Sequence, residues 1–307
     1  MAKVLVTGGA GFIGSHLVDA LVARGDEVRV LDDFSSGKRE NLNQVADAIE
    51  LIEGDIRDGE TMRAALQGVE NVFHQAAMVS VPESIEKPDK CFATNVQAVI
   101  DLLAMAREAG VQRAVLASST AVYGAQARMP LREDYATQTL SPYAASKQFN
   151  ESLATIYSEN FGLPTVALRY FNVYGPRQAP ESEYAAVIPR FMASLKSGQA
   201  PTVYGDGQQT RDFVHVSDVV RANLLAADAA EAAGRAFNVC SGEESSLLAL
   251  LETLYALYPE APEASFEAPR LGDVPRSSGD PSLAEEVLGF KAEISLKAGL
   301  AQLAANP

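Results

Sequence analysis

Short apolar runs alternate with amphipathic stretches through the first half of the chain. Lys3–Thr7 is an apolar run that leads into a glycine-rich turn, and Ile13, Leu17 and Leu21 then follow at helical spacing until Gly25. Repetition of this strand–helix order predicts an α/β fold with a parallel, doubly wound sheet. Ligands of such sheets bind at the carboxyl ends of the strands. The other expected strands are Glu27–Leu31, Glu50–Ile52, Asn71–His74, Arg113–Ala117 and Thr165–Leu168, and the expected long helices are Cys91–Glu108 and Pro142–Glu159.

The pattern is less regular in the second half. Tyr174–Glu183 and Glu260–Pro275 are rich in proline, which predicts loops, the second of them a loop or edge structure over a site. No repeat, low-complexity tract or flexible linker interrupts the chain, so we expect two closely packed domains. The larger domain would comprise residues 1–171 plus 212–241, and a smaller α/β domain that caps the substrate would comprise residues 172–211 plus 242–307. Helices are expected at Val187–Lys196, Ser217–Ala227 and Leu247–Leu257, and strands at Phe213–His215 and Ala236–Val239.

Composition and charge narrow the classes of partner. Hydrophobic residues make up 47% of the 307 residues, which is enough for a substantial core. Lysine and arginine number 25 against 40 aspartates and glutamates, a net charge of −15 that repels nucleic acid. A few local arginines can still hold one diphosphate. No secretory pattern opens the chain, and no apolar run approaches the roughly 20 residues of a membrane span, so we expect a cytoplasmic protein without a membrane partner.

The cysteine content bears on redox and metal chemistry. Cys91 and Cys240 are the only two cysteines, and their spacing matches no metal site. One disulfide could form, but two buried free thiols suit a reducing cytosol better. We therefore expect free thiols and no metal.

Glycines follow the first expected strand at the spacing of a dinucleotide-binding turn. Gly8, Gly11 and Gly14 form G-x-x-G-x-x-G, a variant of the Rossmann fingerprint that lets backbone amides approach a pyrophosphate at a helix N-terminus. Asp32 ends the second strand, where a carboxylate accepts hydrogen bonds from the adenosine ribose. It would also repel a 2′-phosphate, which favours NAD over NADP. An ordinary turn, with Asp32 and Asp33 opening a polar loop, is the alternative.

A tyrosine, a lysine and a serine form a candidate catalytic set. Tyr143 and Lys147 lie four residues apart on an expected helix that has Ser141 as its N-cap, and so share one face. A phenol is a poor base at neutral pH, and a nearby ammonium favours its phenolate. Ser119 ends the fifth strand, where its hydroxyl could steady a developing alkoxide. A surface Tyr–Lys pair is the alternative, but the chain order of glycine turn, ribose acid, hydroxyl and Tyr-x-x-x-Lys favours catalysis.

These motifs make the chain resemble the extended short-chain dehydrogenase/reductase family, specifically its UDP-hexose 4-epimerases. The resemblance runs along almost the whole chain. It implies that Tyr143 takes the proton from the sugar 4-hydroxyl while hydride passes to NAD, and that Ser119 positions the hydroxyl. The 4-keto sugar then turns and receives hydride on its other face, and Lys147 holds the nicotinamide ribose. Further matching segments are His74–Ala77, Thr94–Val96, Arg169–Arg177, Gly205–Gly207 and Arg211–Val216.

The resemblance also implies the residues that contact NAD. Val79 departs from the lysine that glucose epimerases often carry, so that contact is lost. Asp55 follows the third strand and could bond the adenine amino group, although Gly-Asp is also common turn chemistry. The implied contacts are Gly8, Gly11, Phe12, Ile13, Gly14, Asp32, Asp33, Phe34, Ser35, Ser36, Gly37, Asp55, Ile56, Gln75, Ala76, Ala77, Val79, Asn95, Tyr143, Lys147 and Phe171.

A second implied set would hold the UDP-sugar. Arg211 and Arg270 suit a diphosphate because a guanidinium offers paired donors and a permanent charge. Asp273 could take a uridine ribose hydroxyl, and Tyr204 could stack on uracil. The implied contacts are Ser80, Ser119, Thr120, Tyr143, Asn172, Ala186, Val187, Tyr204, Arg211, Arg270, Asp273 and Ser277.

One position bears on the choice of hexose. In the resembled family a bulky tyrosine beside the sugar C2 group restricts the enzyme to glucose and galactose. The matching residue here is Ser277, which leaves room for an N-acetyl group. We therefore expect turnover of UDP-GlcNAc/UDP-GalNAc as well as UDP-Glc/UDP-Gal, unless other groups close the pocket. The resemblance further implies a homodimer through the helices Cys91–Glu108 and Pro142–Glu159.

Other functions of the same fold stay open at this point. Dehydratases of the superfamily place an Asp-Glu pair after the strand-end hydroxyl, and decarboxylating relatives place a glutamate there. This chain has Thr120 and Ala121 instead, which favours simple reversible oxidation at C4. A UDP-glucuronate 4-epimerase or decarboxylase is the nearest alternative. A non-catalytic NAD-sensing Rossmann protein is a third, because a fold alone does not imply a function.

Overall fold

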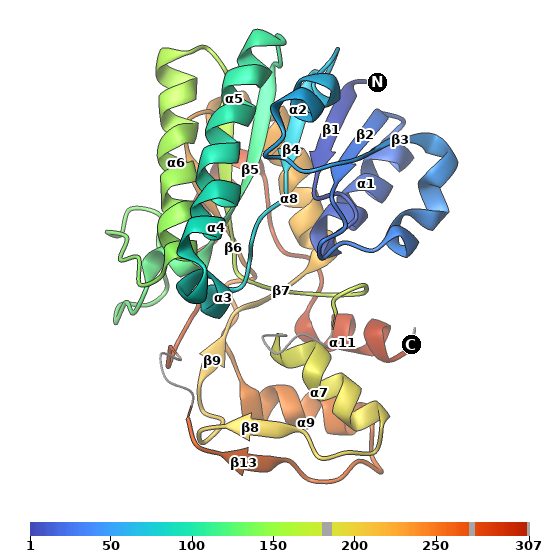
Figure 1. Ribbon diagram of the computed structural model, residues 1–307. Coiled ribbons are helices and arrows are strands. Elements are labelled where there is room, and N and C mark those ends of the chain that lie inside the picture. The colour runs from blue at the N-terminus through green and yellow to red at the C-terminus, as the bar shows by residue number, and fades with distance from the viewer. Residues whose placement is uncertain (180–185, 270–273, 306–307) are drawn as a thin grey trace.

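The computed structural model describes residues 1–179, 186–269 and 274–305. Its centre is a seven-stranded sheet in the order β11-β6-β5-β4-β1-β2-β3, with every neighbouring pair parallel (Figure 1). This order is that of a doubly wound dinucleotide-binding sheet with one added edge strand, and it confirms the predicted fold class. The strands are β1 (Lys3–Thr7), β2 (Glu27–Asp32), β3 (Ile49–Glu53), β4 (Asn71–His74), β5 (Arg113–Ser119), β6 (Thr165–Tyr170) and β11 (Ala236–Val239).

Helices cover both faces of the sheet. Alternation of side chains along β1 sends Val4 and Val6 into one apolar cluster and Leu5 into the other, so the strand is apolar throughout. The first cluster is closed by helices α1 and α8, and α10 packs on α8 and β11. The second lies under α2, α5 and α6. These helices are α1 (Phe12–Arg24), α2 (Gly59–Ala65), α5 (Ala98–Glu108), α6 (Pro142–Asn160), α8 (Val216–Asp228) and α10 (Ser282–Leu288).

The two long predicted helices have different outcomes. Pro142–Glu159 is confirmed as α6, which begins where Ser141 Oγ accepts the Ala144 amide at 3.1 Å. Cys91–Glu108 is instead the end of a longer helical run that begins at α4 (Pro88–Phe92), passes through a wider turn at Ala93–Gln97 and continues as α5. That wider turn has the i→i+5 bonding of a π-helix, a feature frequent at functional sites.

A smaller α/β layer lies beyond the carboxyl ends of the central strands, at the bottom of Figure 1. Its apolar cluster draws on residues 172–211 and 242–307, with Phe213 added. The helix α10 belongs to the second of these segments yet packs on the central sheet. The remaining elements are β7 (Asn172–Tyr174) paired with β10 (Phe213–His215), β8 (Thr202–Tyr204) with β13 (Ser265–Glu267), β9 (Thr210–Arg211) with β12 (Ser245–Ser246), and helices α3 (Val81–Glu86), α7 (Val187–Lys196), α9 (Leu247–Leu257) and α11 (Leu296–Ala305).

Both cysteines are buried free thiols. Cys91 lies in α4, and Cys240 follows β11 directly. Across the described ranges, no helix combines the length and the apolar character needed to cross a membrane.

Candidate active site

The carboxyl ends of six adjacent strands carry residues that the sequence singled out. Parallel register brings these strand ends to one edge of the sheet, facing the smaller layer. Residues that are far apart in the chain therefore form one row, as the sequence predicted. From β3 to β6 the row reads Asp55, Asp32, Gly8, Gln75, Ser119 and Phe171.

The glycine turn between β1 and α1 brings main-chain segments into close contact. A Cβ at Gly14 would lie 2.1 Å from the Gly8 carbonyl oxygen, and one at Gly8, whose φ is +69°, would lie 2.6 Å from the Ala76 amide nitrogen. Gly11 is the N-cap of α1 and supplies no side-chain acceptor for the first-turn amides. The turn therefore offers unobstructed main chain and a helix N-terminus, which fits the pyrophosphate of a dinucleotide.

Asp32 is held beside this turn. Its carboxylate accepts the Ala10 and Phe34 amides, both at 2.8 Å, and the residue is 6% exposed. Burial raises the pKa of Asp32, while the two amide hydrogen bonds act in the opposite direction. A Cβ at Gly37 would lie 2.9 Å from Asp32 Oδ1, so the following loop passes close to the carboxylate. This placement fits an acid that receives ribose hydroxyls.

Three other predicted cofactor residues already have protein partners. Asp55 binds Arg57, whose guanidinium lowers the pKa of that carboxyl. The Asn95 amide accepts from the Met78 nitrogen at 2.8 Å and donates to the Met78 oxygen at 2.9 Å. Gln75 donates to the Tyr170 hydroxyl at 3.0 Å. Contacts of these three side chains with NAD stay predictions.

The predicted catalytic residues come together at the ends of β5 and α6. The Ser119 hydroxyl lies near enough to the Tyr143 phenol to act on it and oppose a rise of its pKa. Lys147 Nζ donates to the Ala117 carbonyl oxygen at 2.8 Å and lies 5.8 Å from the centre of the Tyr143 ring. Tyr143 is half-buried, whereas Lys147 is 2% exposed. The arrangement places a phenol, a hydroxyl and an ammonium at one point of the row.

Burial controls the charges at this point. It lowers the pKa of Lys147 to about 8, which leaves the ammonium mostly protonated at neutral pH. Burial raises the pKa of Tyr143, and the interaction with Ser119 opposes that shift. His74 at the end of β4 has its pKa lowered to about 3 by burial and by the Lys147 charge, so its ring is neutral, and it bonds Thr7 Oγ1 at 2.7 Å. Lys147 is thus the positive charge that faces the phenol.

Two of the described substrate-end residues, Arg211 and Ser277, lie at or beside β9. Arg211 Nη1 donates to the Thr210 and Val274 carbonyl oxygens, both at 2.7 Å. Ser277 exchanges main-chain hydrogen bonds with Thr210 and Asp212, which places it beside Arg211. Arg270 and Asp273 lie outside the described residues.

The other substrate-end residues lie in several elements. Asn172 in β7 donates to the Asp212 carbonyl oxygen at 3.0 Å. The Tyr204 ring in β8 lies 5.5 Å from the Arg190 guanidinium carbon. Ser80 is the N-cap of α3 and accepts the Glu83 amide at 3.1 Å. The remaining predicted contacts are Thr120, which follows β5 directly, Ala186, the N-cap of α7, and Val187, the first residue of α7.

Several residues near the site were not predicted from the sequence. His74 and Thr7 pair behind the glycine turn, and Tyr170 is close enough to Tyr143 that the two phenols influence each other. Burial raises the pKa of Tyr170 to about 12. A third group, centred on Glu151, ties α6 to the sheet. Of these, His74 and Tyr170 had a signal in the sequence, since both occur in family-like segments.

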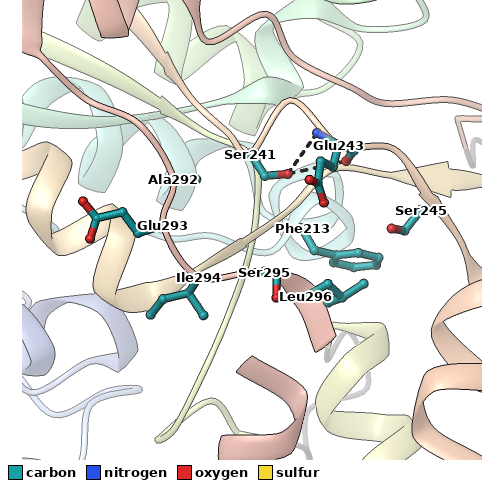
Figure 2. Close-up of a pocket in the computed structure, with 9 residues that line it drawn as sticks. All are labelled: Phe213, Ser241, Glu243, Ser245, Ala292, Glu293, Ile294, Ser295 and Leu296. Atoms are coloured by element: carbon teal, nitrogen blue, oxygen red, sulfur yellow. Dashed lines mark hydrogen bonds between the residues drawn. The ribbon is translucent and has the colours of Figure 1, made fainter. Parts of the chain in front are cut away.

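Two hollows in the described residues lie away from the row. One of about 130 Å3 lies between β10, the turn after β11 and the segment that leads into α11 (Figure 2). There Ser241 Oγ accepts the Glu243 amide at 3.1 Å, beside the Phe213 ring. The other, of about 380 Å3, lies between α6 and the loop that precedes it. Neither contains a residue of the predicted catalytic set.

Comparison with known proteins places the chain in a family. The model of the NAD dependent epimerase/dehydratase family matches residues 4–240. A protein of Methanocaldococcus jannaschii described as a putative UDP-glucose 4-epimerase is 40% identical, over 97% of this chain and 95% of the relative.

Two solved structures extend the comparison. The UDP-N-acetylglucosamine 4-epimerase of Methanobrevibacter ruminantium, in complex with UDP-N-acetylmuramic acid, has a TM-score of 0.94 at 36% identity, over 100% of this chain and 99% of that one. The UDP-glucose 4-epimerase of Thermus thermophilus, in complex with NAD, has a TM-score of 0.90 at 37% identity, over 99% and 98%. The chain belongs to the NAD dependent epimerase/dehydratase family.

Proposed function

We propose that this protein is an NAD-dependent enzyme that inverts C4 of UDP-linked hexoses. The observation that carries the proposal is the contact of the Tyr143 phenol with Ser119, next to the Lys147 ammonium, at the same sheet edge as the glycine turn. A phenol, a hydroxyl and an ammonium in this order suit reversible oxidation of a secondary alcohol. Family membership and the similar 4-epimerases support the same reaction.

The glycine turn and Asp32 are the residues that would hold NAD. The first-turn amides of α1 would bind the pyrophosphate, and the Asp32 carboxylate would bind the adenosine ribose. Lys147 would reach the second ribose. NAD supplies the group that takes hydride from C4 and gives it back. We propose that the other NAD contacts named in the sequence analysis come from the loops that follow the carboxyl ends of the central strands.

The chain's own groups would manage the proton. Tyr143 would accept the proton of the sugar 4-hydroxyl, while Ser119 shares a hydrogen bond with the same oxygen. The Lys147 ammonium favours the phenolate form of Tyr143 and is fixed by the Ala117 carbonyl. Reversal of the proton transfer after the 4-keto sugar has turned would complete the inversion. Neutral His74 adds no competing charge.

The uridine diphosphate would be bound by the smaller layer. Arg211 on β9 would bind the diphosphate, and Asn172 and Tyr204 lie on neighbouring elements of that layer. Ser277, beside Arg211, supports a pocket with room for an acetamido group at C2. We therefore propose activity on UDP-Glc/UDP-Gal and on UDP-GlcNAc/UDP-GalNAc.

We also propose that the enzyme is a homodimer of the cytoplasm. Phe149 and Ile156 lie seven residues apart on α6, and each is 42% exposed. Phe92 of α4 and Phe161 after α6 are also exposed, so several large apolar side chains lie on the helices that the family resemblance names. A second copy of the chain would bury them. The two free thiols suit a reducing compartment.

The proposal is tested with the purified protein and four nucleotide sugars. UDP-Gal, UDP-Glc, UDP-GalNAc and UDP-glucuronate are incubated separately without added NAD, and the products are read by NMR. Interconversion within the glucose and N-acetylglucosamine pairs is expected. Turnover of UDP-glucuronate alone would replace the proposal by the uronic-acid alternative, and binding of NAD without turnover of any sugar would favour a sensor. Absence of UDP-GalNAc turnover would reject only the broad pocket.

A further inference from the structure

Two successive turns of α6 carry Tyr143 and Lys147, and both residues contact the end of β5. The Ser119 hydroxyl interacts with the Tyr143 phenol, and the Ala117 carbonyl oxygen accepts from Lys147 Nζ at 2.8 Å. Residues four apart lie on one face of a helix, so the next turn of this face carries Glu151. The proposed reaction uses Tyr143 and Lys147 directly, whereas Glu151 would not touch the reacting atoms.

Glu151 nevertheless binds the strand residue that lies between Ala117 and Ser119. Ser118 Oγ donates to Glu151 Oε1 at 2.6 Å. Three consecutive residues of β5 thus contact three residues of α6 at a spacing of four.

An arginine of the neighbouring strand completes the Glu151 contact. Arg169 of β6 donates to the same carboxylate through Nε at 2.9 Å and Nη2 at 2.7 Å. Its Nη1 donates to the Tyr123 hydroxyl at 2.7 Å. Ser118 is 2% exposed, Arg169 5% exposed and the Glu151 side chain 11% exposed, so the ion pair is largely buried.

We propose that Glu151 is a positioning residue of the active site, which with Ser118 and Arg169 sets where α6 docks on β5 and hence where Tyr143 stands relative to Ser119. This inference rests on the proposed function.

The physical reason lies in the directionality of the contact. Apolar packing between a helix and a sheet permits small shifts along and around the helix axis, because its energy depends weakly on such shifts. A carboxylate that accepts three hydrogen bonds from two strands has one favourable position, and a buried ion pair is better suited to fixing register than to adding stability. Displacement of reacting groups by about 1 Å can cost a reaction about a hundredfold in rate.

Ser118→Ala is the decisive variant. It removes the contact with β5 and leaves the Glu151–Arg169 pair in place, so the protein should stay folded. Ser158→Ala is the matched control, because Ser158 Oγ also ties α6 to β6, accepting the Thr165 amide at 2.9 Å, but near the far end of the helix. Glu151→Asp keeps the charge for Arg169 while its side chain is one methylene shorter.

Three measurements separate positioning from folding. The first is kcat and KM for UDP-Gal, the second is bound NAD per chain, and the third is the pH at which kcat reaches half of its plateau. The titratable groups that face Tyr143 and Lys147 are Cys91 of α4, His74 of β4 and Tyr170 of β6. All three stay unchanged in every variant, so a shifted midpoint reports the Tyr143–Lys147 geometry.

We expect Ser118→Ala to lower kcat about tenfold with KM and NAD content unchanged. Its pH midpoint should move upward, because a looser Tyr–Lys pair stabilises the phenolate less. Glu151→Asp should do the same, and the double variant should be no worse than either single one, since both break one contact.

Three results would overturn the inference. One is a Ser118→Ala enzyme whose kcat and pH midpoint equal those of Ser158→Ala. A second is a double variant whose fold-loss of kcat equals the product of the fold-losses in the two single variants. The third is a loss of kcat that merely parallels the loss of folded protein. A wild-type protein that turns over no UDP-sugar would instead refute the proposed function, and so the two failures are distinguishable.

Discussion

At the scale of single residues, burial sets the charge of the catalytic groups. Lys147 is 2% exposed, and the hydrogen bond from its ammonium to the Ala117 carbonyl oxygen compensates only part of the lost hydration. The pKa of about 8 records this cost. Function is thus obtained at the expense of stability, because the cation that favours the Tyr143 phenolate is unfavourable for folding.

The cost of Lys147 gives a pH-dependent stability. Its pKa is lowered from 10.5 in a free side chain to about 8 in the folded protein, so the unfolded chain binds the proton more tightly. The wild type should therefore gain stability as pH rises through this interval, by about 3 kcal/mol relative to Lys147→Met. Urea unfolding of both NAD-free proteins between pH 7 and about pH 10.5 measures the difference. Parallel stability curves would contradict it.

Tyr143 gives the simplest prediction about rate. Tyr143→Phe removes the proton acceptor and should lower kcat about a thousandfold, which is within the range for loss of a general base. Bound NAD should stay near the wild-type amount, because the pyrophosphate and ribose contacts are elsewhere. Tyr157→Phe on the same helix is the control, since that hydroxyl makes only a 3.5 Å contact with the Ile100 carbonyl. Retained turnover in Tyr143→Phe would assign the base to another group.

At the scale of elements, the turn between β1 and α1 depends on the absence of side chains. A methyl group at Gly14 would overlap the Gly8 carbonyl oxygen, and neither segment can move without displacing β1, an interior strand of the sheet. The helix must approach the strand this closely for its first-turn amides to reach a pyrophosphate at the sheet edge.

Gly14→Ala tests this turn. We expect the affinity for NAD to fall about tenfold or more, since overpacking of this kind costs about 1–3 kcal/mol. Isothermal titration of the NAD-free protein measures the loss. Gly59→Ala is the control, because a Cβ at the start of α2 meets nothing nearer than Met105 Cε at 3.4 Å. Equal affinities in the two variants would mean that the turn tolerates a side chain.

Periodic helices and bounded apolar strands could be predicted from the sequence, whereas short strands without an apolar run could not. The bounds of α7 and α9 are as predicted, because ten or so residues carry a clear helical period. Those of β4, β10 and β11 are also as predicted, because each is a bounded run of mostly apolar residues. Strands such as β8 and β13 have three residues each, too few to show alternation. They exist because a distant segment supplies hydrogen-bond partners, as Ser265–Glu267 does for Thr202–Tyr204.

Some residues of the candidate site could likewise be predicted from the sequence, and others could not. Tyr143, Lys147 and Ser119 could be found because their spacing and their places at element ends are recognisable. Ser118 and Glu151 could not, since a serine in a strand and a glutamate on a helix are ordinary residues. Their contact joins positions 33 apart, and only the docking of α6 on β5 brings them together.

At the scale of the whole molecule, the central sheet would bind NAD and the smaller layer would bind the nucleotide sugar. The reacting carbon would then lie where the layers meet, at the Tyr143 end of α6. The same helix presents Phe149 and Ile156 to solvent. Assembly through that face would hold α6, and with it the catalytic tyrosine, between two copies of the sheet.

The proposed dimer makes a simple prediction. Phe149→Glu should convert a particle of about twice 32.6 kDa into one of 32.6 kDa, because a buried carboxylate at an apolar interface is unfavourable. Light scattering after size-exclusion chromatography measures the mass. Phe266→Glu is the control, since Phe266 is 57% exposed on β13, away from this face, and should leave the mass unchanged. A wild-type mass of one chain would refute the dimer.

The central claim is that C4 is inverted by removal and return of its own hydrogen as hydride. The most direct measurement uses UDP-galactose that carries deuterium at C4, converted in ordinary water, with the UDP-glucose product examined by NMR and mass spectrometry. The account predicts that the deuterium stays at C4, because Tyr143 exchanges only the hydroxyl proton with solvent. Loss of the label to water would contradict the account, since it would mean that C4 is inverted by proton removal from carbon.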